Sequence, residues 1–148
     1  MLRIATLLLI LFWAPAFAAP VPKVKVKDVE AIQGEWKLIE LLHDGKPWEQ
    51  QKLVNAQATV NKGTMTVKGV RTDTDEIFAY TLDAERKQID LRMKQPDPQY
   101  EHRGVYSLDG DTLTIAMSLG NSRERPENVK AGVGVAYLVY HRVKEEKK

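Results

Sequence analysis

The chain has 148 residues, 43% of them hydrophobic, and it contains no cysteine. This length suits one domain with its own hydrophobic core, and the lack of cysteine excludes disulfides, thiolate metal sites and a cysteine nucleophile. The formal net charge of +2 at pH 7 is too close to balance to indicate nucleic acid or an anionic membrane as a partner.

Residues 1–18 have the pattern of a cleavable secretory signal peptide. Arg3 supplies a positive charge, residues 4–13 are apolar apart from Thr6, and small residues precede the expected cleavage point. The run is shorter than the ~20 apolar residues that a membrane span needs, and Pro15 interrupts it. The sequence therefore predicts export to the periplasm or outside the cell. The mature chain should begin near Ala19 and contain no other segment fit to cross a membrane.

The rest of the chain divides into a leader, one domain and a tail. Residues 19–30 begin with prolines and alternate lysine with valine, which indicates an extended leader. Residues 31–143 carry the periodicity of a folded domain. Residues 144–148 are all lysine or glutamate, which is typical of a solvated tail.

In the domain, apolar residues recur mostly at every second position, and turn residues interrupt them at short intervals. This pattern predicts antiparallel strands joined by hairpins. We predict strands near residues 34–42, 56–61, 64–70, 76–82, 88–93, 103–108, 112–117 and 135–142. Short helices are predicted at 28–33 and 47–54.

The clearest turn is Asp109-Gly110, which lies between two alternating apolar runs. Both residues tolerate the positive φ that a type I′ hairpin turn demands. Further reversals are predicted at 61–63 and 83–87. Sequential hairpins build a meander, and about eight twisted strands can close into a barrel without exposed edges. The predicted fold is thus an all-β, small closed antiparallel barrel with one or two short helices, and an open two-sheet sandwich remains an alternative.

Three segments resemble a lipocalin-like domain family of exported bacterial proteins, abundant in planctomycetes and without an assigned activity. They are Ile32–Leu38 with the turn Asp44–Pro47, the hairpin Gly104–Leu113, and Arg125-Pro126 ahead of a glycine-rich stretch and a final apolar strand. Together they cover almost the whole mature chain in the expected order. The resemblance implies a barrel fold and says nothing of activity. The family often has a cysteine in the strand after the hairpin, and this chain has none.

The pair Gly34-x-Trp36 also resembles the opening motif of lipocalins in general. In that motif the tryptophan closes one end of the barrel, and an arginine near the last strand lies across it. Arg142 is the matching arginine in this chain. An arginine over an indole ring gains about 0.5–2 kcal/mol, depending on burial, and covers the ring from water. The resemblance therefore implies a structural role for these residues.

Residues that could carry catalysis or bind metal do not form a recognisable set. His43, His102 and His141 have no paired spacing of the kind that zinc sites use, so no metal site is predicted. The acids at 73–76 and 109–111 suit turns better than a calcium loop. Three serines are candidate nucleophiles without the Gly-x-Ser-x-Gly elbow; they are Ser107, Ser118 and Ser122.

The long polar segment 118–127 is a candidate ligand site, because loops of this length in compact domains are often functional. Arg123 and Arg125 could hold a carboxylate or phosphate with paired hydrogen bonds. A loop between the last two strands lies at one mouth of a barrel, so we expect these arginines to face an entering ligand. The alternative is a solvated loop whose arginines pair with Glu124 or Glu127.

Eight strands enclose a space for side chains or for one small ligand, and the aromatic residues could line it or fill it. The sequence predicts an exported, non-enzymatic, lipocalin-like protein without a cofactor. Its open end would bind a small apolar or anionic ligand, or an envelope protein. Large inward side chains throughout would favour an interaction module with a filled barrel. A hydrolase is a further alternative.

Overall fold

The computed structural model describes residues 28–49, 53–70, 74–120 and 122–144. The predicted signal peptide and most of the predicted leader and tail lie outside these residues. No helix within the described ranges has the length and hydropathy needed to cross a bilayer.

Strands form most of the regular structure in the described residues. The elements are α1 (Asp28–Ala31), β1 (Gly34–His43), β2 (Lys46–Pro47), β3 (Gln57–Asn61), β4 (Thr64–Lys68), β5 (Glu76–Asp83), β6 (Gln88–Gln95), β7 (Glu101–Asp109), β8 (Thr112–Ser118) and β9 (Val135–Arg142). Each predicted strand is present, with ends that differ by two residues at most. The predicted second helix at 47–54 is wrong at Pro47, which pairs with Leu42 as part of β2. Residues 50–52 lie outside the described ranges.

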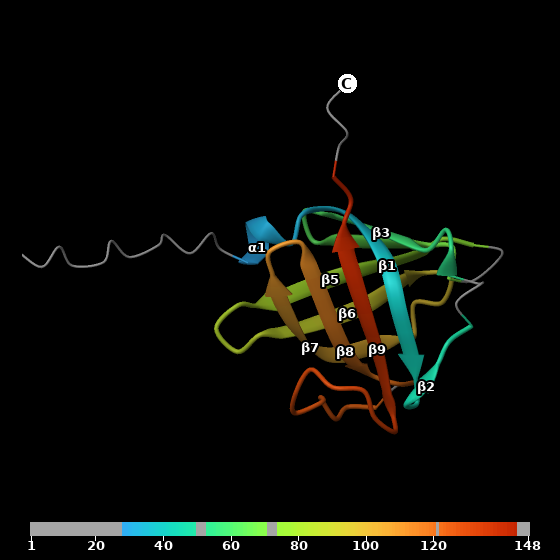
Figure 1. Ribbon diagram of the computed structural model, residues 1–148. Helices are drawn as coiled ribbons and strands as arrows, with labels where there is room; N and C mark the ends of the chain where they lie inside the picture. Colours follow the sequence, from blue (N-terminus) through green and yellow to red (C-terminus); the bar gives the residue numbers. More distant parts are fainter. Residues whose placement is uncertain (1–27, 50–52, 71–73, 121, 145–148) are drawn as a thin grey trace, which may run out of the picture.

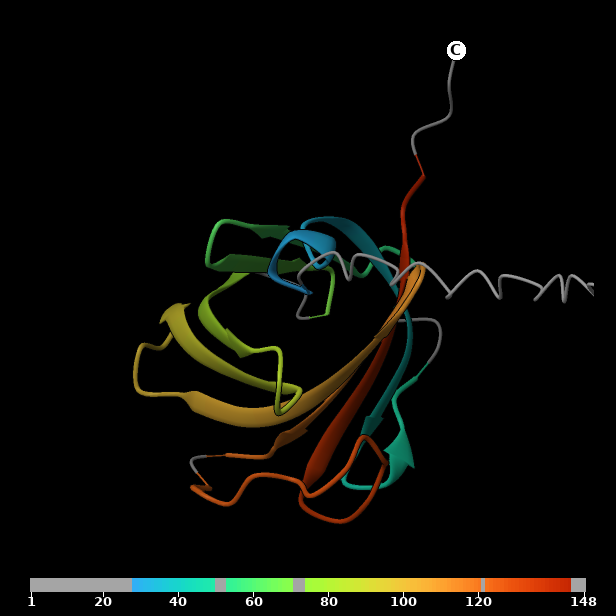
Figure 2. The ribbon, with the colours of Figure 1, turned by 90° about the vertical axis from the view of Figure 1, so that its left-hand side faces the viewer.

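Eight of the nine strands form a closed antiparallel barrel. β1 pairs with β3, each following strand pairs with the next, and β9 returns to pair with β1. β2 is an additional short strand on the end of β1. The closed barrel confirms the predicted fold and decides against the sandwich, whose sheets would have open edges. Figures 1 and 2 show α1 at one end of the barrel and the segment between β8 and β9 at the other.

The β7–β8 hairpin is present, but its turn lies one residue later than predicted. Asp109 pairs with Thr112, so Gly110 and Asp111 occupy the two central positions. Of these two, only Gly110 has a positive φ, at 56°. A positive φ at the first central position is the pattern of a type II′ turn, which favours glycine there. Asp109 is therefore the last residue of β7.

The other two predicted reversals are also present. Between β3 and β4, Lys62 and Gly63 have φ values of 42° and 84°, as a type I′ turn requires. Between β5 and β6, the Asp83 carboxylate accepts hydrogen bonds from the backbone N–H groups of Glu85 (3.1 Å) and Arg86 (3.0 Å). The side chain of Asp83 thus stabilises its turn by bonding the backbone locally.

Trp36 closes the end of the barrel next to α1. Its side chain is 0% exposed, and its indole N–H donates a hydrogen bond to the carbonyl of Ile32 (2.9 Å). Arg142, at the end of β9, lies over the ring, with 4.1 Å between the guanidinium carbon and the ring centroid. This geometry confirms the predicted contact between the first and last strands.

Arg142 also attaches the turn after α1 to the barrel. Its guanidinium donates hydrogen bonds to the carbonyls of Ala31 (2.5 Å) and Gln33 (2.8 Å) and pairs with Asp111 (3.4 Å). Gly34 gives this side chain room, because a Cβ there would lie 3.2 Å from Nη1. Its φ of 116° also favours glycine. These contacts support the structural role that the sequence motif implies.

Gly104 on β7 provides a test of how tightly the barrel wall is packed. A Cβ at this position would lie 2.8 Å from the Ala116 carbonyl oxygen and 3.3 Å from a methyl carbon of Ile89. We expect Gly104→Ala to lower the free energy of unfolding by about 1–3 kcal/mol, as overpacking does. Gly132→Ala is the control, because no atom lies within 4 Å of its added Cβ. Urea unfolding measures both, and equal small changes would contradict the close packing at Gly104.

Candidate functional site

The barrel contains a cavity of about 110 Å³ in the half away from Trp36. Its wall is apolar at nine of eleven side chains. The side chains of Val70 and Met117 are partly exposed, so the cavity reaches towards the surface at these two residues. The lining residues are Leu41, Met65, Val67, Val70, Glu76, Phe78, Leu91, Ile115, Met117, Leu138 and Tyr140.

Two lining residues are polar, Tyr140 and Glu76. Tyr140 is 1% exposed, and its burial raises the pKa of the phenol, to which the negative charge of Glu76 adds. The phenol is therefore protonated at neutral pH and can both donate and accept a hydrogen bond. The cavity thus combines apolar walls with one hydroxyl group and one carboxylate, a composition that suits a small, partly apolar ligand.

An aromatic group extends from the cavity wall towards the surface. The ring of His102 lies 6.3 Å from that of Phe78 and is stacked 6.4 Å from that of Tyr100, with an interplanar angle of 12°. Phe78 lines the cavity, whereas Tyr100 is 39% exposed. The three rings therefore form a continuous row of contacts from the cavity wall to the surface.

The His102 ring has a defined orientation. Its Nδ1 lies 3.1 Å from the carbonyl oxygen of Ser118. Because a carbonyl can only accept, Nδ1 must be the protonated nitrogen, and Nε2 is the acceptor of the neutral ring. The hydroxyl of Ser118 is not the atom in contact with the histidine. It is bonded to the backbone of Arg103 and Ser122, and Ser118 is 3% exposed, so it is not presented as a nucleophile.

The other two histidines lie apart from this group. His43 pairs with Ala136 at one end of the β1–β9 ladder, and His141 pairs with Lys37 near the other end. Both are exposed. No group of three or more potential metal-ligating side chains occurs within the described ranges.

Arg125 lies against the outer wall of the barrel and does not line the cavity. Its Nη1 donates a hydrogen bond to the Gly104 carbonyl (2.7 Å) and forms an ion pair with Asp90 (2.6 Å). Asp90 faces outwards, because its neighbours Ile89 and Leu91 are buried in the core. Arg125 therefore anchors the β8–β9 segment to β6 and β7.

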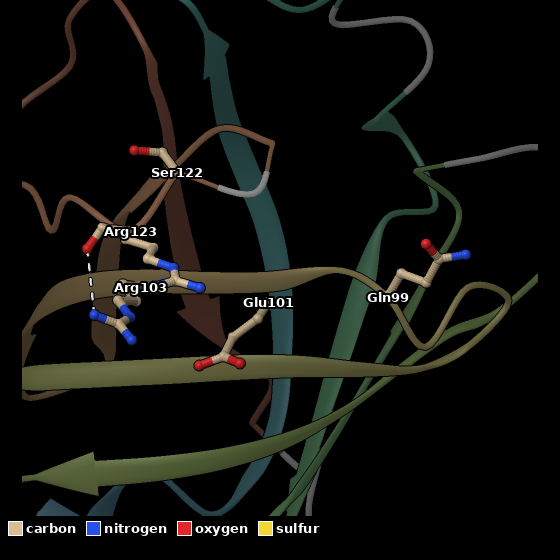
Figure 3. Close-up of a pocket in the computed structure, with 5 residues that line it drawn as sticks. All are labelled: Gln99, Glu101, Arg103, Ser122 and Arg123. Atoms are coloured by element: carbon tan, nitrogen blue, oxygen red, sulfur yellow. Dashed lines mark hydrogen bonds between the residues drawn. The ribbon is translucent and has the colours of Figure 1, made fainter.

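Arg123 lies in a groove of about 260 Å³ on the outside of the barrel (Figure 3). The groove is lined by Gln99, Glu101, Arg103, Ser122 and Arg123. Nη1 of Arg103 donates a hydrogen bond to the backbone carbonyl of Arg123 (3.3 Å). Thus Arg123 has Arg103 as its neighbour in the groove, and Arg125 is not among the lining residues.

The role of Arg103 was not predicted from the sequence. It is an outward residue on a strand, and such a residue has the same pattern as any solvated cation. Its hydrogen bond to the carbonyl of Arg123 forms only because the β8–β9 segment folds back onto β7.

Comparisons with protein-family models, with curated proteins and with solved structures find no match to this chain. The resemblance in three segments to a lipocalin-like family therefore stays a prediction.

Proposed function

We propose that this protein is an exported, non-enzymatic, lipocalin-like barrel that binds the apolar part of a small ligand at its open end. The observation that carries the proposal is the cavity of about 110 Å³, with its mostly apolar wall and its partly exposed rim at Val70 and Met117. Burial of apolar surface from water would supply most of the binding free energy. The Tyr140 phenol would orient a polar group of the ligand.

The volume of the cavity limits the size of that ligand. Pockets for drug-sized ligands are about 300–1,000 Å³, and an apolar cavity of about 150 Å³ is known to hold benzene. The cavity of about 110 Å³ is smaller than both, so it suits the end of an alkyl chain, and a small ring would enter only if the wall moved. Met65 and Met117 in its wall have flexible side chains that can enlarge it.

The alternative is an envelope interaction module whose barrel is filled. Large side chains fill the half of the barrel near α1, among them Trp36, Tyr106 and Leu113, which are all at most 1% exposed. In such a module the cavity would be a packing void without a ligand. Binding of a small apolar probe separates the two functions.

We expect the chain lacking residues 1–18 to bind toluene saturably, as measured by NMR shifts of the Met65 and Met117 methyl groups. Met117→Trp should fill the rim and weaken binding by about tenfold or more, equivalent to about 1.4 kcal/mol. Val133→Trp is the control, because Val133 is 89% exposed and does not line the cavity. If the unmodified protein shows no saturable shift, the cavity is a void and the interaction module is the better account.

A further inference from the structure

We propose that the groove on the outside of β7 is a second binding site, which holds a carboxylate group between Arg103 and Arg123. The groove shares no lining residue with the barrel cavity. The proposal is therefore independent of the function proposed for the open end.

The charges on this wall of the barrel are unevenly paired. Arg92 pairs with Glu101 (3.5 Å) and Arg125 pairs with Asp90 (2.6 Å). Within the described ranges, neither Arg103 nor Arg123 forms an ion pair. The two guanidinium groups in this groove thus have no ion-pair partner among the described residues, and an external anion would supply one.

The backbone around Arg123 is held in place before any ligand arrives. The carbonyl of Arg123 accepts a hydrogen bond from Arg103, and that of Ser122 accepts one from the Ser118 hydroxyl (3.3 Å). Two residues later, Arg125 is bound to the carbonyl of Gly104. Because these contacts fix the segment against β7, a ligand would not have to order it, which lowers the entropic cost of binding.

Figure 3 shows how the groups lie. The side chains of Arg103 and Arg123 are next to each other over β7, and the amide of Gln99 lies at the far end of the groove. A guanidinium offers several N–H donors in one plane, which match the two oxygens of a carboxylate. The Gln99 amide can donate to a more distant acceptor on the same ligand.

Glu101 restricts the charge of the ligand. Its carboxylate lines the same groove, so a doubly charged anion such as phosphate would be repelled more strongly than a singly charged carboxylate. Glu101 can also accept a hydrogen bond from an N–H group on the ligand. A carboxylate with an amide beside it, as at the end of a peptide, would bind the two arginines through the carboxylate and Glu101 through the amide N–H.

The probes are acetate, N-acetylglycine and inorganic phosphate, titrated into the chain lacking residues 1–18 at constant ionic strength. The measurement is the NMR shift of the arginine Nε–H signals. We expect saturable millimolar binding of both carboxylates at the signals of Arg103 and Arg123. Similar affinities for the two probes would identify a free small carboxylate as the ligand type, and tighter binding of N-acetylglycine would identify a peptide terminus.

Arg103→Gln and Arg123→Gln should each weaken carboxylate binding by about tenfold or more. Arg86→Gln is the control, because it makes the same charge change in the exposed β5–β6 turn and should leave the affinity unchanged. Met117→Trp should also leave the carboxylate affinity unchanged. The test of the groove is therefore separate from the test of the cavity. Shifts that do not saturate, or an equal loss in Arg86→Gln, would mean general charge screening and overturn the proposal. Tighter binding of phosphate would overturn the assignment to a carboxylate.

Discussion

Replacing Trp36 with alanine should lower the free energy of unfolding by about 3–5 kcal/mol, as truncation of large buried aromatic side chains does. The indole is 0% exposed, donates to the Ile32 carbonyl and lies under the guanidinium of Arg142. Alanine would leave a cavity, a buried carbonyl without its donor and an arginine without its ring. Equilibrium unfolding in guanidinium chloride, followed by circular dichroism, measures the change.

His43→Ala is the matched control for this variant. His43 is the last residue of the same strand, and its side chain is exposed. Its replacement should change the free energy of unfolding by no more than about 0.5 kcal/mol. If both variants lower the free energy of unfolding by the same small amount, Trp36 does not close the end of the barrel.

Arg142→Ala should cost about 2–4 kcal/mol of stability. The substitution removes two hydrogen bonds from a charged donor to the carbonyls of Ala31 and Gln33 and uncovers the face of Trp36. Such hydrogen bonds contribute about 1.5–3 kcal/mol each, and the partial exposure of Arg142 reduces their sum. Arg142→Lys should lower stability by less than Arg142→Ala, because lysine keeps the positive charge. It should still be less stable than the unmodified protein, because lysine lacks the planar fork that reaches both carbonyls.

Arg123→Ala is the control for Arg142, since it removes the same charge from an exposed side chain. We expect it to change stability by no more than about 0.5 kcal/mol. A double-mutant cycle between Trp36→Ala and Arg142→Ala should give a coupling energy of about 0.5–2 kcal/mol. If Arg142→Ala and Arg123→Ala lower stability equally, with no coupling to Trp36, Arg142 does not help Trp36 to close the end of the barrel.

The strands could be predicted because their signal is local. A strand with one buried face needs an apolar residue at every second position, and Leu113 and Ile115 on β8 follow this rule. The turns also have a local signal, but the turn predicted at Asp109-Gly110 lies one residue later, at Gly110-Asp111. Both Asp-Gly and Gly-Asp are acceptable turn pairs, and the strand register, which depends on β7 pairing with β8, selects between them.

The strands and their hairpin order could be predicted from the sequence, because the alternation of residues carries that information. The contact between Trp36 and Arg142 was implied by the resemblance to the lipocalin opening motif. The pairing of β9 with β1, which closes the sheet, is visible only in the three-dimensional fold. The fold also shows how little volume stays empty inside the barrel and where the arginines of the β8–β9 segment lie. Arg125 was predicted to face the barrel mouth, but Asp90 and the Gly104 carbonyl hold it against the outer wall. These contacts join residues far apart in the chain, and no periodicity in the sequence records such pairings.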